Sequence, residues 1–279
     1  MRDGRPVMEC SLMTTRDPAE EDLARRAIQD LMARGELRTR RRRVYLVSYP
    51  RSGNTLARRY FAILQGRAQH SVYAGDVVIP MGPAVTDSLD NVDIIKSHQF
   101  PDDDAATIYL VRDGRNATLS FLYMTFLFGG HMFSELSQVS DAIRQLDTTE
   151  GSWADHVAQA HQQSERRSTL FVRYEDLISE PAASLMRMAR FMNAEISAED
   201  ARACVLRQPA SDDYANNPSN GYTYQPATGS IYDVLKKNRR SDYWGLIFDD
   251  RSKRYFHECG ATRWLLQFGY ERSADWWTR

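Results

Sequence analysis

The sequence lacks the features of a membrane-spanning, secreted or nucleic-acid-coating protein. It has no run of about 18 apolar residues, as a membrane-spanning helix requires, and residues 1–20 are mixed and charged, unlike a signal peptide. Its cysteines, Cys10, Cys204 and Cys259, are odd in number and widely spaced, and so predict neither a disulfide framework nor a CxxC metal site. The 36 basic and 37 acidic residues leave a net charge of −1, which argues against binding nucleic acid through bulk charge. We therefore expect a cytoplasmic protein with neither a membrane nor a nucleic-acid partner.

The chain's 279 residues, of which 42% are apolar and 26% charged, have the composition of an ordinary globular protein. We interpret residues 1–43 as a peripheral arm, with a helix over residues 20–33, and residues 44–279 as a single domain. The arm ends in a basic block, residues 38–43. Because the rest of the chain is near neutral, we interpret this block as a solvated lead-in to a strand, with a contact for nucleic acid or another acidic partner as the alternative.

Four short runs predict strands, at residues 44–49, 92–97, 107–111 and 169–173, and the first, rich in β-branched and aromatic residues, is typical of a buried strand. A helical pattern follows three of these runs. The helix after the first run ends near Gly66, the one after the third starts near Asn116, and the one after the fourth extends from Pro181 to about Met192. This alternation predicts an α/β fold, a three-layer α/β/α domain with a central, mainly parallel sheet. Residues 98–106 are short for a crossover helix, so the second and third strands need not be neighbours.

The C-terminal part of the chain changes character. Residues 212–243 are rich in Asn, Pro, Gly and Tyr and have little periodicity. Long segments of this kind in a compact domain are often lids, so we expect one that orders over bound substrates. A last amphipathic helix is predicted over residues 251–268, before Gly269.

The turn between the first strand and its helix is suited to an anion. Backbone N–H groups of Ser52, Gly53, Asn54 and Thr55 would lie at the helix N-terminus, where the helix dipole favours negative charge. Gly53 permits close approach of a ligand, and Arg51 adds fixed positive charge. A phosphate or sulfate group would fit there, whereas the glycines and lysine of a Walker A loop are missing. A purely structural polar turn is the alternative.

Polar residues also follow the second and third predicted strands. Lys96 and His98 end the second strand, and Arg112 ends the third, with Ser120 in the helix beyond it. A lone histidine is usually structural, and an Arg-Asp-Gly-Arg turn is often a surface ion pair. However, the carboxyl ends of parallel strands converge on one crevice. We therefore expect Arg51, His98 and Arg112 to face the same ligand.

Taken in order, these segments resemble the sulfotransferases that use 3′-phosphoadenosine 5′-phosphosulfate (PAPS). Residues 48–55, Ser-Tyr-Pro-Arg-Ser-Gly-Asn-Thr, are similar to the family's 5′-phosphosulfate loop, Y-P-K-S-G-T-T. Residues 96–98, Lys-Ser-His, resemble its K-T-H tripeptide, and residues 108–120 its 3′-phosphate motif. Residues 174–181, Tyr-Glu-Asp-Leu followed by Pro181, resemble its Y-E-D-L segment. The match extends from residue 44 to about residue 191.

The resemblance implies a P-loop-like fold and a role for each matching residue. His98 would be the general base, with Lys96 and Arg51 beside the transferring sulfuryl group. The residues that would hold PAPS are Arg51, Ser52, Gly53, Asn54, Thr55, Leu56, Arg112, Ser120, Tyr174 and either Arg239 or Arg240. The acceptor would be a hydroxyl of a small molecule, such as a natural product, or of a carbohydrate, with walls from residues 69–90, 124–140 and 212–243. No metal is expected, because His156 and His161 do not have the spacing of a zinc helix.

The sequence departs from the family pattern at three places. Arg51 replaces the usual lysine, Leu56 stands where cytosolic members have a tryptophan against the adenine, and residues 237–244 match the C-terminal R-K-G…G-D-W signature only loosely. Two other functions stay open. One is a nucleotide or nucleoside kinase, which would need Mg–ATP without a Walker lysine. The other is a non-catalytic module that binds 3′-phosphoadenosine 5′-phosphate (PAP), the product of PAPS after transfer.

Overall fold

A five-stranded parallel sheet forms the centre of the computed structural model, which describes residues 18–37, 41–129, 136–146, 150–208 and 243–279. The strands lie in the order β2-β3-β1-β4-β5. Their bounds are β1 (Arg42–Ser48), β2 (His70–Ser71), β3 (Val92–Ser97), β4 (Ala106–Val111) and β5 (Thr169–Arg173). The four predicted strands are confirmed. Strand β2 was missed because its two residues are too few to show a hydrophobic pattern.

Strand β1 is the point at which the order of the strands reverses. It pairs in parallel with β3 on one side and with β4 on the other. The two strands joined by residues 98–105 are therefore not neighbours, as the shortness of that connection predicted. In the register of the sheet, Val47 lies opposite Ser97 and Ser48 opposite Leu110. The segments that follow β1, β3 and β4 consequently meet at one edge, beside the reversal, where parallel sheets bind ligands.

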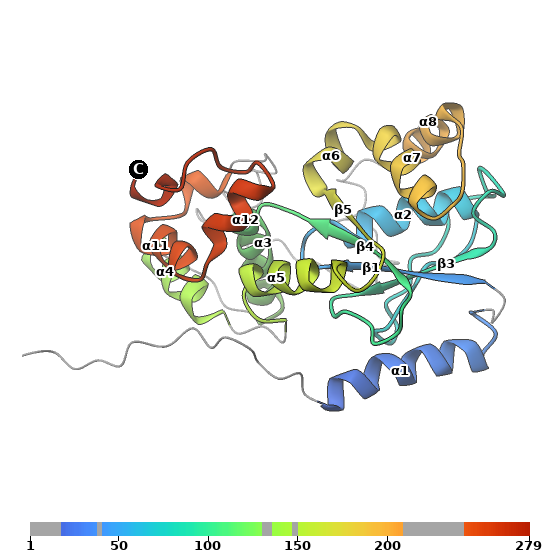
Figure 1. The fold of residues 1–279 in the computed structure, drawn as a ribbon, viewed down its shortest axis with the longest axis horizontal. Helices are drawn as coiled ribbons and strands as arrows, with labels where there is room; N and C mark the ends of the chain where they lie inside the picture. Colours follow the sequence, from blue (N-terminus) through green and yellow to red (C-terminus); the bar gives the residue numbers. More distant parts are fainter. Residues whose placement is uncertain (1–17, 38–40, 130–135, 147–149, 209–242) are drawn as a thin grey trace, which may run out of the picture.

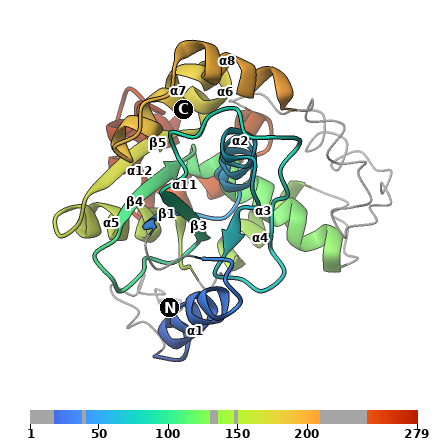
Figure 2. The same ribbon diagram turned by 90° about the vertical axis from the view of Figure 1, so that its right-hand side faces the viewer.

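Helices cover both faces of the sheet (Figures 1 and 2). One face is covered by α2 (Asn54–Gln65), α6 (Tyr174–Ser179), α7 (Pro181–Phe191) and α8 (Ala198–Arg207). The other face and its C-terminal extension carry α1 (Pro18–Ala33), α3 (Gly114–Gly129), α4 (Leu136–Gln145), α5 (Trp153–Ser164), α11 (Asp250–Glu258) and α12 (Ala261–Gln267), with short 3-10 turns η2 (Tyr243–Leu246) and η3 (Trp276–Thr278). None of the described helices is both long and apolar enough to cross a membrane.

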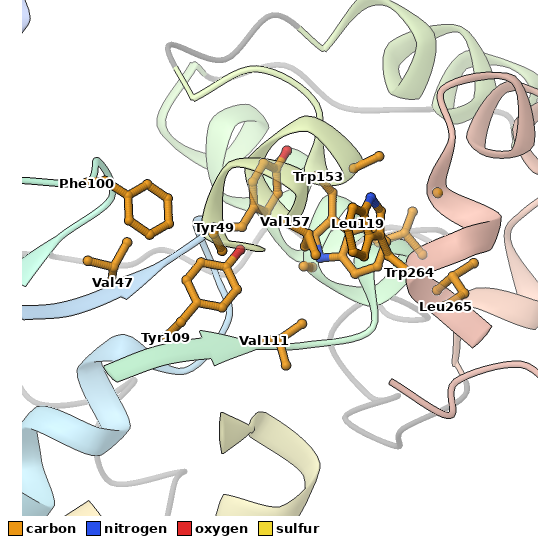
Figure 3. Packing of buried hydrophobic residues seen from close by; sticks show 14 of the residues in the cluster. Val47, Tyr49, Phe100, Tyr109, Val111, Leu119, Trp153, Val157, Trp264 and Leu265 are labelled. Atoms are coloured by element: carbon orange, nitrogen blue, oxygen red, sulfur yellow. The ribbon is translucent and has the colours of Figure 1, made fainter. Parts of the chain in front are cut away.

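Two apolar clusters, one on each side of the sheet, form the core. Alternate residues of β1 point to opposite sides, so Val44 and Leu46 pack under α2 and α7, whereas Tyr45 and Val47 pack on the other side. The second of these clusters extends from the sheet to α12, past Trp153 (Figure 3). The three-layer α/β/α fold predicted from the sequence is confirmed.

The predicted C-terminal helix is wrong in its extent. Helix α11 ends at Glu258, and α12 begins at Ala261 after Gly260, which has a left-handed backbone (φ 79°). An apolar pattern continues across such a break, so periodicity alone does not detect it. The chain also packs beyond Gly269, where the buried Trp276 donates its indole N–H to Thr262 Oγ1 at 2.9 Å.

The described part of the basic block has a structural role at the start of β1. Arg41 forms an ion pair with Asp93 and Arg43 one with Asp103, each at 3.3 Å. Residues 38–40 lie outside the described part of the chain. These ion pairs support the interpretation of the block as a lead-in to the strand.

Candidate functional site

The turn after β1 exposes the N-terminus of α2. Arg51 and Gly53 both have left-handed backbones, with φ values of 67° and 96°. Such a conformation is strained for arginine, and strain of this kind is concentrated at functional sites. Gly53 is the N-cap residue of α2, and no side chain caps the helix. The first-turn N–H groups have no acceptor within the helix, so the turn is suited to an anion.

Two side chains of this turn, Asn54 and Ser52, differ in their hydrogen bonding within the fold. Asn54 donates from Nδ2 to the carbonyl of Leu46 at 2.8 Å and to Ser48 Oγ at 3.3 Å, and thereby ties the turn to β1. Ser52 is fully buried, and its Oγ has no hydrogen-bond partner among the described residues. A buried hydroxyl without a partner is costly, and an anion at the α2 N-terminus would relieve that cost.

Four of the predicted binding residues come together around this turn from separate segments. Arg51 donates from Nε to Ser120 Oγ at 3.1 Å, and Arg112 donates from NH1 to the carbonyl of Arg51 at 2.9 Å. The guanidinium of Arg112 also lies 4.6 Å from the centre of the Tyr174 ring. The result is a positively charged floor with an aromatic ring beside it, a combination suited to a phosphorylated nucleotide.

Gly53 lets the Tyr174 ring pack against this turn. A Cβ at Gly53 would lie 2.4 Å from Tyr174 Cδ2. We therefore expect Gly53→Ala to displace the ring and strain the turn, and to weaken binding of PAP roughly tenfold. Isothermal titration calorimetry measures this effect, with Gly35→Ala as the control, because Gly35 also has a left-handed backbone (φ 70°) but open space around its Cβ. Equal PAP affinity in the two variants would contradict the assignment of this turn.

Leu56 occupies a different place from the other residues of the turn. Its side chain packs against the apolar cluster beneath α2 and is partly buried there. The side chain therefore contributes to the core. Thr55 is half-buried in the first turn of α2.

His98 lies at the carboxyl end of β3 with a defined tautomer. Its Nδ1 is 2.7 Å from the carbonyl oxygen of Ser48. Because a carbonyl only accepts, Nδ1 carries the proton and Nε2 keeps a lone pair. Nε2 has no hydrogen-bond partner among the described residues. Burial, aided by the charge of Lys96, lowers the pKa of His98 to about 3, so the ring is neutral at physiological pH.

A second histidine, His156 of α5, supports the backbone of His98. Its Nε2 lies 2.7 Å from the carbonyl oxygen of His98, and its Nδ1 lies 2.8 Å from Tyr109 Oη. His156 therefore donates to His98 and accepts from Tyr109. The spacing of the histidines in the sequence raised only the question of a metal ligand. Another signal in the sequence could have indicated this role. His156 lies on the apolar face of its helix, with Trp153 and Val157, and a polar side chain buried on such a face needs hydrogen-bond partners.

This buried histidine makes stability depend on pH. Burial lowers the pKa of His156 to about 4, so below about pH 6.5 the unfolded chain takes up a proton that the folded chain does not. His156 should therefore reduce the free energy of unfolding by about 1.4 kcal/mol for each pH unit as the pH falls from about 6.5 towards its folded value. Urea unfolding at several pH values should show a shallower decline for His156→Gln, which keeps a donor but does not titrate. Identical slopes would contradict the assignment.

Lys96 has a partner that the sequence did not predict. Its ammonium group is paired with Asp76, 2.7 Å away.

The two arginines of the Arg-Asp-Gly-Arg turn after β4 have different roles. Arg112 faces the anion site. Arg115 is buried, pairs with Asp113 at 2.7 Å and lies 3.7 Å from the centre of the Trp244 ring. Arg115 therefore fixes the turn to the C-terminal helices, and only Arg112 of the two arginines is available to a ligand.

Several predicted residues lie outside the part of the chain that the structure describes. They are Arg239, Arg240 and all of the expected lid (residues 212–243) except its last residue, Tyr243. Within the described residues, no three His, Cys, Asp or Glu side chains are grouped so as to hold a metal ion.

Comparisons with known proteins bear on the family and the fold of the chain. The family described as "Sulfotransferase domain" matches residues 41–259. The chain is 23% identical to human sulfotransferase 1E1 over 65% of this chain and 69% of that protein, and 20% identical to mouse sulfotransferase 1B1 over 66% and 69%. Among solved structures, mouse sulfotransferase SULT7A1 complexed with PAP superposes with a TM-score of 0.54 at 18% identity, covering 85% of this chain and 89% of that one. Retinol dehydratase in a complex with retinol and PAP gives 0.56 at 16% identity, covering 87% and 94%. The fold is that of these structures, and because the family match spans most of the sequence, the chain belongs to the sulfotransferase domain family.

Proposed function

We propose that this protein transfers the sulfuryl group of PAPS to a hydroxyl of a small molecule, in line and with His98 as general base. The observation that carries the proposal is the convergence of four side chains, those of Arg51, Ser120, Arg112 and Tyr174, on the N-terminus of α2. Beside it lies the buried Ser52 hydroxyl, which has no hydrogen-bond partner within the described part of the chain. PAPS, when bound, supplies the activated sulfuryl group.

We assign the residues of the turn to the parts of the nucleotide in the order that the motifs predict. The N–H groups of the first turn of α2, with the Ser52 hydroxyl, would hold the 5′-phosphosulfate. Arg112 and Ser120 would hold the 3′-phosphate, since Arg112 offers a planar fork of donors and lies next to both Arg51 and Tyr174. The Tyr174 ring would lie against the adenine, and Arg239 or Arg240 would complete the 3′-phosphate site.

The chemistry assigned to His98 follows from its tautomer. The bond from Nδ1 to Ser48 fixes the ring so that Nε2 accepts the proton of the acceptor hydroxyl. Arg51 and the N–H groups at the start of α2 stabilise the negative charge that develops on the leaving oxygen, without having to reorganise. Lys96 contributes positive charge beside them, and alignment of nucleophile, sulfur and leaving oxygen supplies much of the remaining rate.

An apolar acceptor is supported by the loop that follows Asp76. The side chains of Val77, Ile79 and Met81 in this loop are 45%, 74% and 52% exposed. Large apolar side chains exposed together are typical of a surface that binds an apolar ligand. Two related structures contain apolar molecules, since retinol dehydratase was solved with retinol and with androsterone. We therefore favour an apolar alcohol or phenol over a carbohydrate.

The test is calorimetric titration with PAP, 5′-ADP and Mg–ATP, followed by a screen for transfer from ³⁵S-labelled PAPS. The screen uses retinol, androsterone, a simple phenol and a sugar. We expect tight binding of PAP alone and transfer to an apolar acceptor. Preference for Mg–ATP would support a kinase instead, and binding of PAP without transfer to any acceptor would support a non-catalytic module.

A further inference from the structure

The loop after β2 places a carboxylate between two cations. One oxygen of Asp76 lies 2.7 Å from Lys96 Nζ, and the other lies 2.8 Å from a guanidinium nitrogen of Arg58. Arg58 is fully buried in α2 and also donates to the carbonyls of Gln69 and Asp76, at 2.9 and 2.8 Å. Arg58 therefore fixes the carboxylate on one side, and Lys96 takes the other side.

Asp76 opposes several influences that disfavour the charged form of Lys96. Burial lowers the pKa of Lys96, the charge and hydrogen bond of Asp76 oppose this effect, and Arg58 and Arg51 add to it. On the remaining side the centre of the Tyr73 ring lies 5.3 Å from Nζ. Asp76 is thus the group whose negative charge offsets the effect of desolvation on the ammonium group of Lys96.

Asp76 itself is ionised at any physiological pH. Burial raises its pKa, but Arg58 and Lys96 together lower it to about 2. The three side chains therefore carry a net positive charge next to His98, and Tyr73 links the two parts because its hydroxyl accepts the backbone N–H of His98 at 3.1 Å.

We propose that Asp76 is a positioning residue, which holds Lys96 as an ammonium ion beside His98 while Arg58 fixes the carboxylate. The inference rests on the proposed function, in which Lys96 faces the sulfuryl group. A neutral or displaced lysine would not offer positive charge to the oxygens that become more negative during transfer.

The protonation state of Lys96 is measurable without any acceptor. Only a neutral amine reacts with acetic anhydride, so competitive labelling from about pH 6 to 11 gives the midpoint at which each lysine loses its proton. The lysines of the chain are Lys96, Lys236, Lys237 and Lys253, and mass spectrometry separates the peptide of Lys96 from that of Lys253. We expect Asp76→Asn to lower the midpoint of Lys96 by about one pH unit or more and leave that of Lys253 unchanged.

Three further variants control this experiment. Asp76→Glu keeps the charge and should keep the midpoint near that of the wild type, and Asp90→Asn removes an exposed carboxylate elsewhere. Arg58→Met with Asp76→Asn removes both members of the ion pair between the buried Arg58 and the partly exposed Asp76. This double change costs less stability than leaving the buried Arg58 without its partner, and so supplies a folded protein if Asp76→Asn does not fold. Its Lys96 midpoint should lie below that of Arg58→Met alone. The proposal would be overturned if the Lys96 midpoint of Asp76→Asn equalled that of the wild type, or if the midpoint of the double variant equalled that of Arg58→Met.

Turnover separates positioning from a purely structural role. With the most rapidly sulfated acceptor of the panel, Asp76→Asn should lower kcat about tenfold and leave PAP affinity unchanged, and it should add little to Lys96→Met. An unchanged kcat would overturn the inference while leaving the proposed function intact. Failure of the wild-type protein to bind PAP would instead reject the proposed function, whatever the labelling shows.

Discussion

We expect His98→Ala to lower kcat by roughly 10²–10⁴-fold and to leave the affinity for PAP nearly unchanged. The reason is the geometry of the imidazole, whose Nδ1–H is fixed on the Ser48 carbonyl 2.7 Å away so that Nε2 is the atom left to accept a proton. Among the described residues, His98 forms its hydrogen bonds with Ser48, Tyr73 and His156 and with no residue of α2, so nucleotide binding should survive. Initial rates of transfer from labelled PAPS, together with calorimetry, measure the two quantities separately.

A matched control for this variant is His257→Ala in α11. His257 is bonded to Thr262 at 3.0 Å and stacked on Trp277, away from the anion site. It should leave kcat near the wild-type value. Near-normal turnover by His98→Ala would remove His98 from the mechanism. Since the pKa of His98 is about 3, kcat/KM should also show no loss from this histidine between about pH 8 and pH 5.

The sequence alone was sufficient to predict the edge of the sheet at which the site lies. Strands β1, β3 and β4 have strong hydrophobic patterns because they are buried in the sheet, whereas β5 lies at its edge and is only partly buried. Gly53 and Arg112 follow closely on strand ends. Features of this kind are local in the chain. They were enough to predict the order of the elements and to bring Arg51, His98 and Arg112 to the same edge.

The partners of these residues were not predictable in the same way. Asp76 contacts Lys96 across 20 positions, and His156 contacts the backbone of His98 across 58. Nothing in the spacing of either residue marks it, because each contact depends on how a loop or helix packs onto the finished sheet. Strand β2 and the break at Gly260 were missed for the opposite reason, since each is too short to alter a periodic pattern.

Arg112→Ala should remove the preference for a 3′-phosphate. A hydrogen-bonded charge pair of this kind contributes about 1.5–3 kcal/mol, so PAP affinity should fall by about 10- to 100-fold, towards that of 5′-ADP. The affinity for 5′-ADP should change much less, and Arg254→Ala, an exposed arginine of α11, should change neither. Calorimetric titration of each variant with both nucleotides gives the ratio directly.

The ratio matters because Arg112 also holds the turn. Arg112 donates to the carbonyl of Arg51 at 2.9 Å, so a purely structural role would make its loss loosen the α2 N-terminus and weaken the binding of every nucleotide. In that case the affinities for PAP and for 5′-ADP would fall together, and the ratio of the two affinities would stay at the wild-type value. The 3′-phosphate would then have to be held elsewhere, and Arg51 with Ser120, 3.1 Å apart on the same floor, would be the first pair to test. A selective loss of PAP affinity would instead place the 3′-phosphate on Arg112 itself.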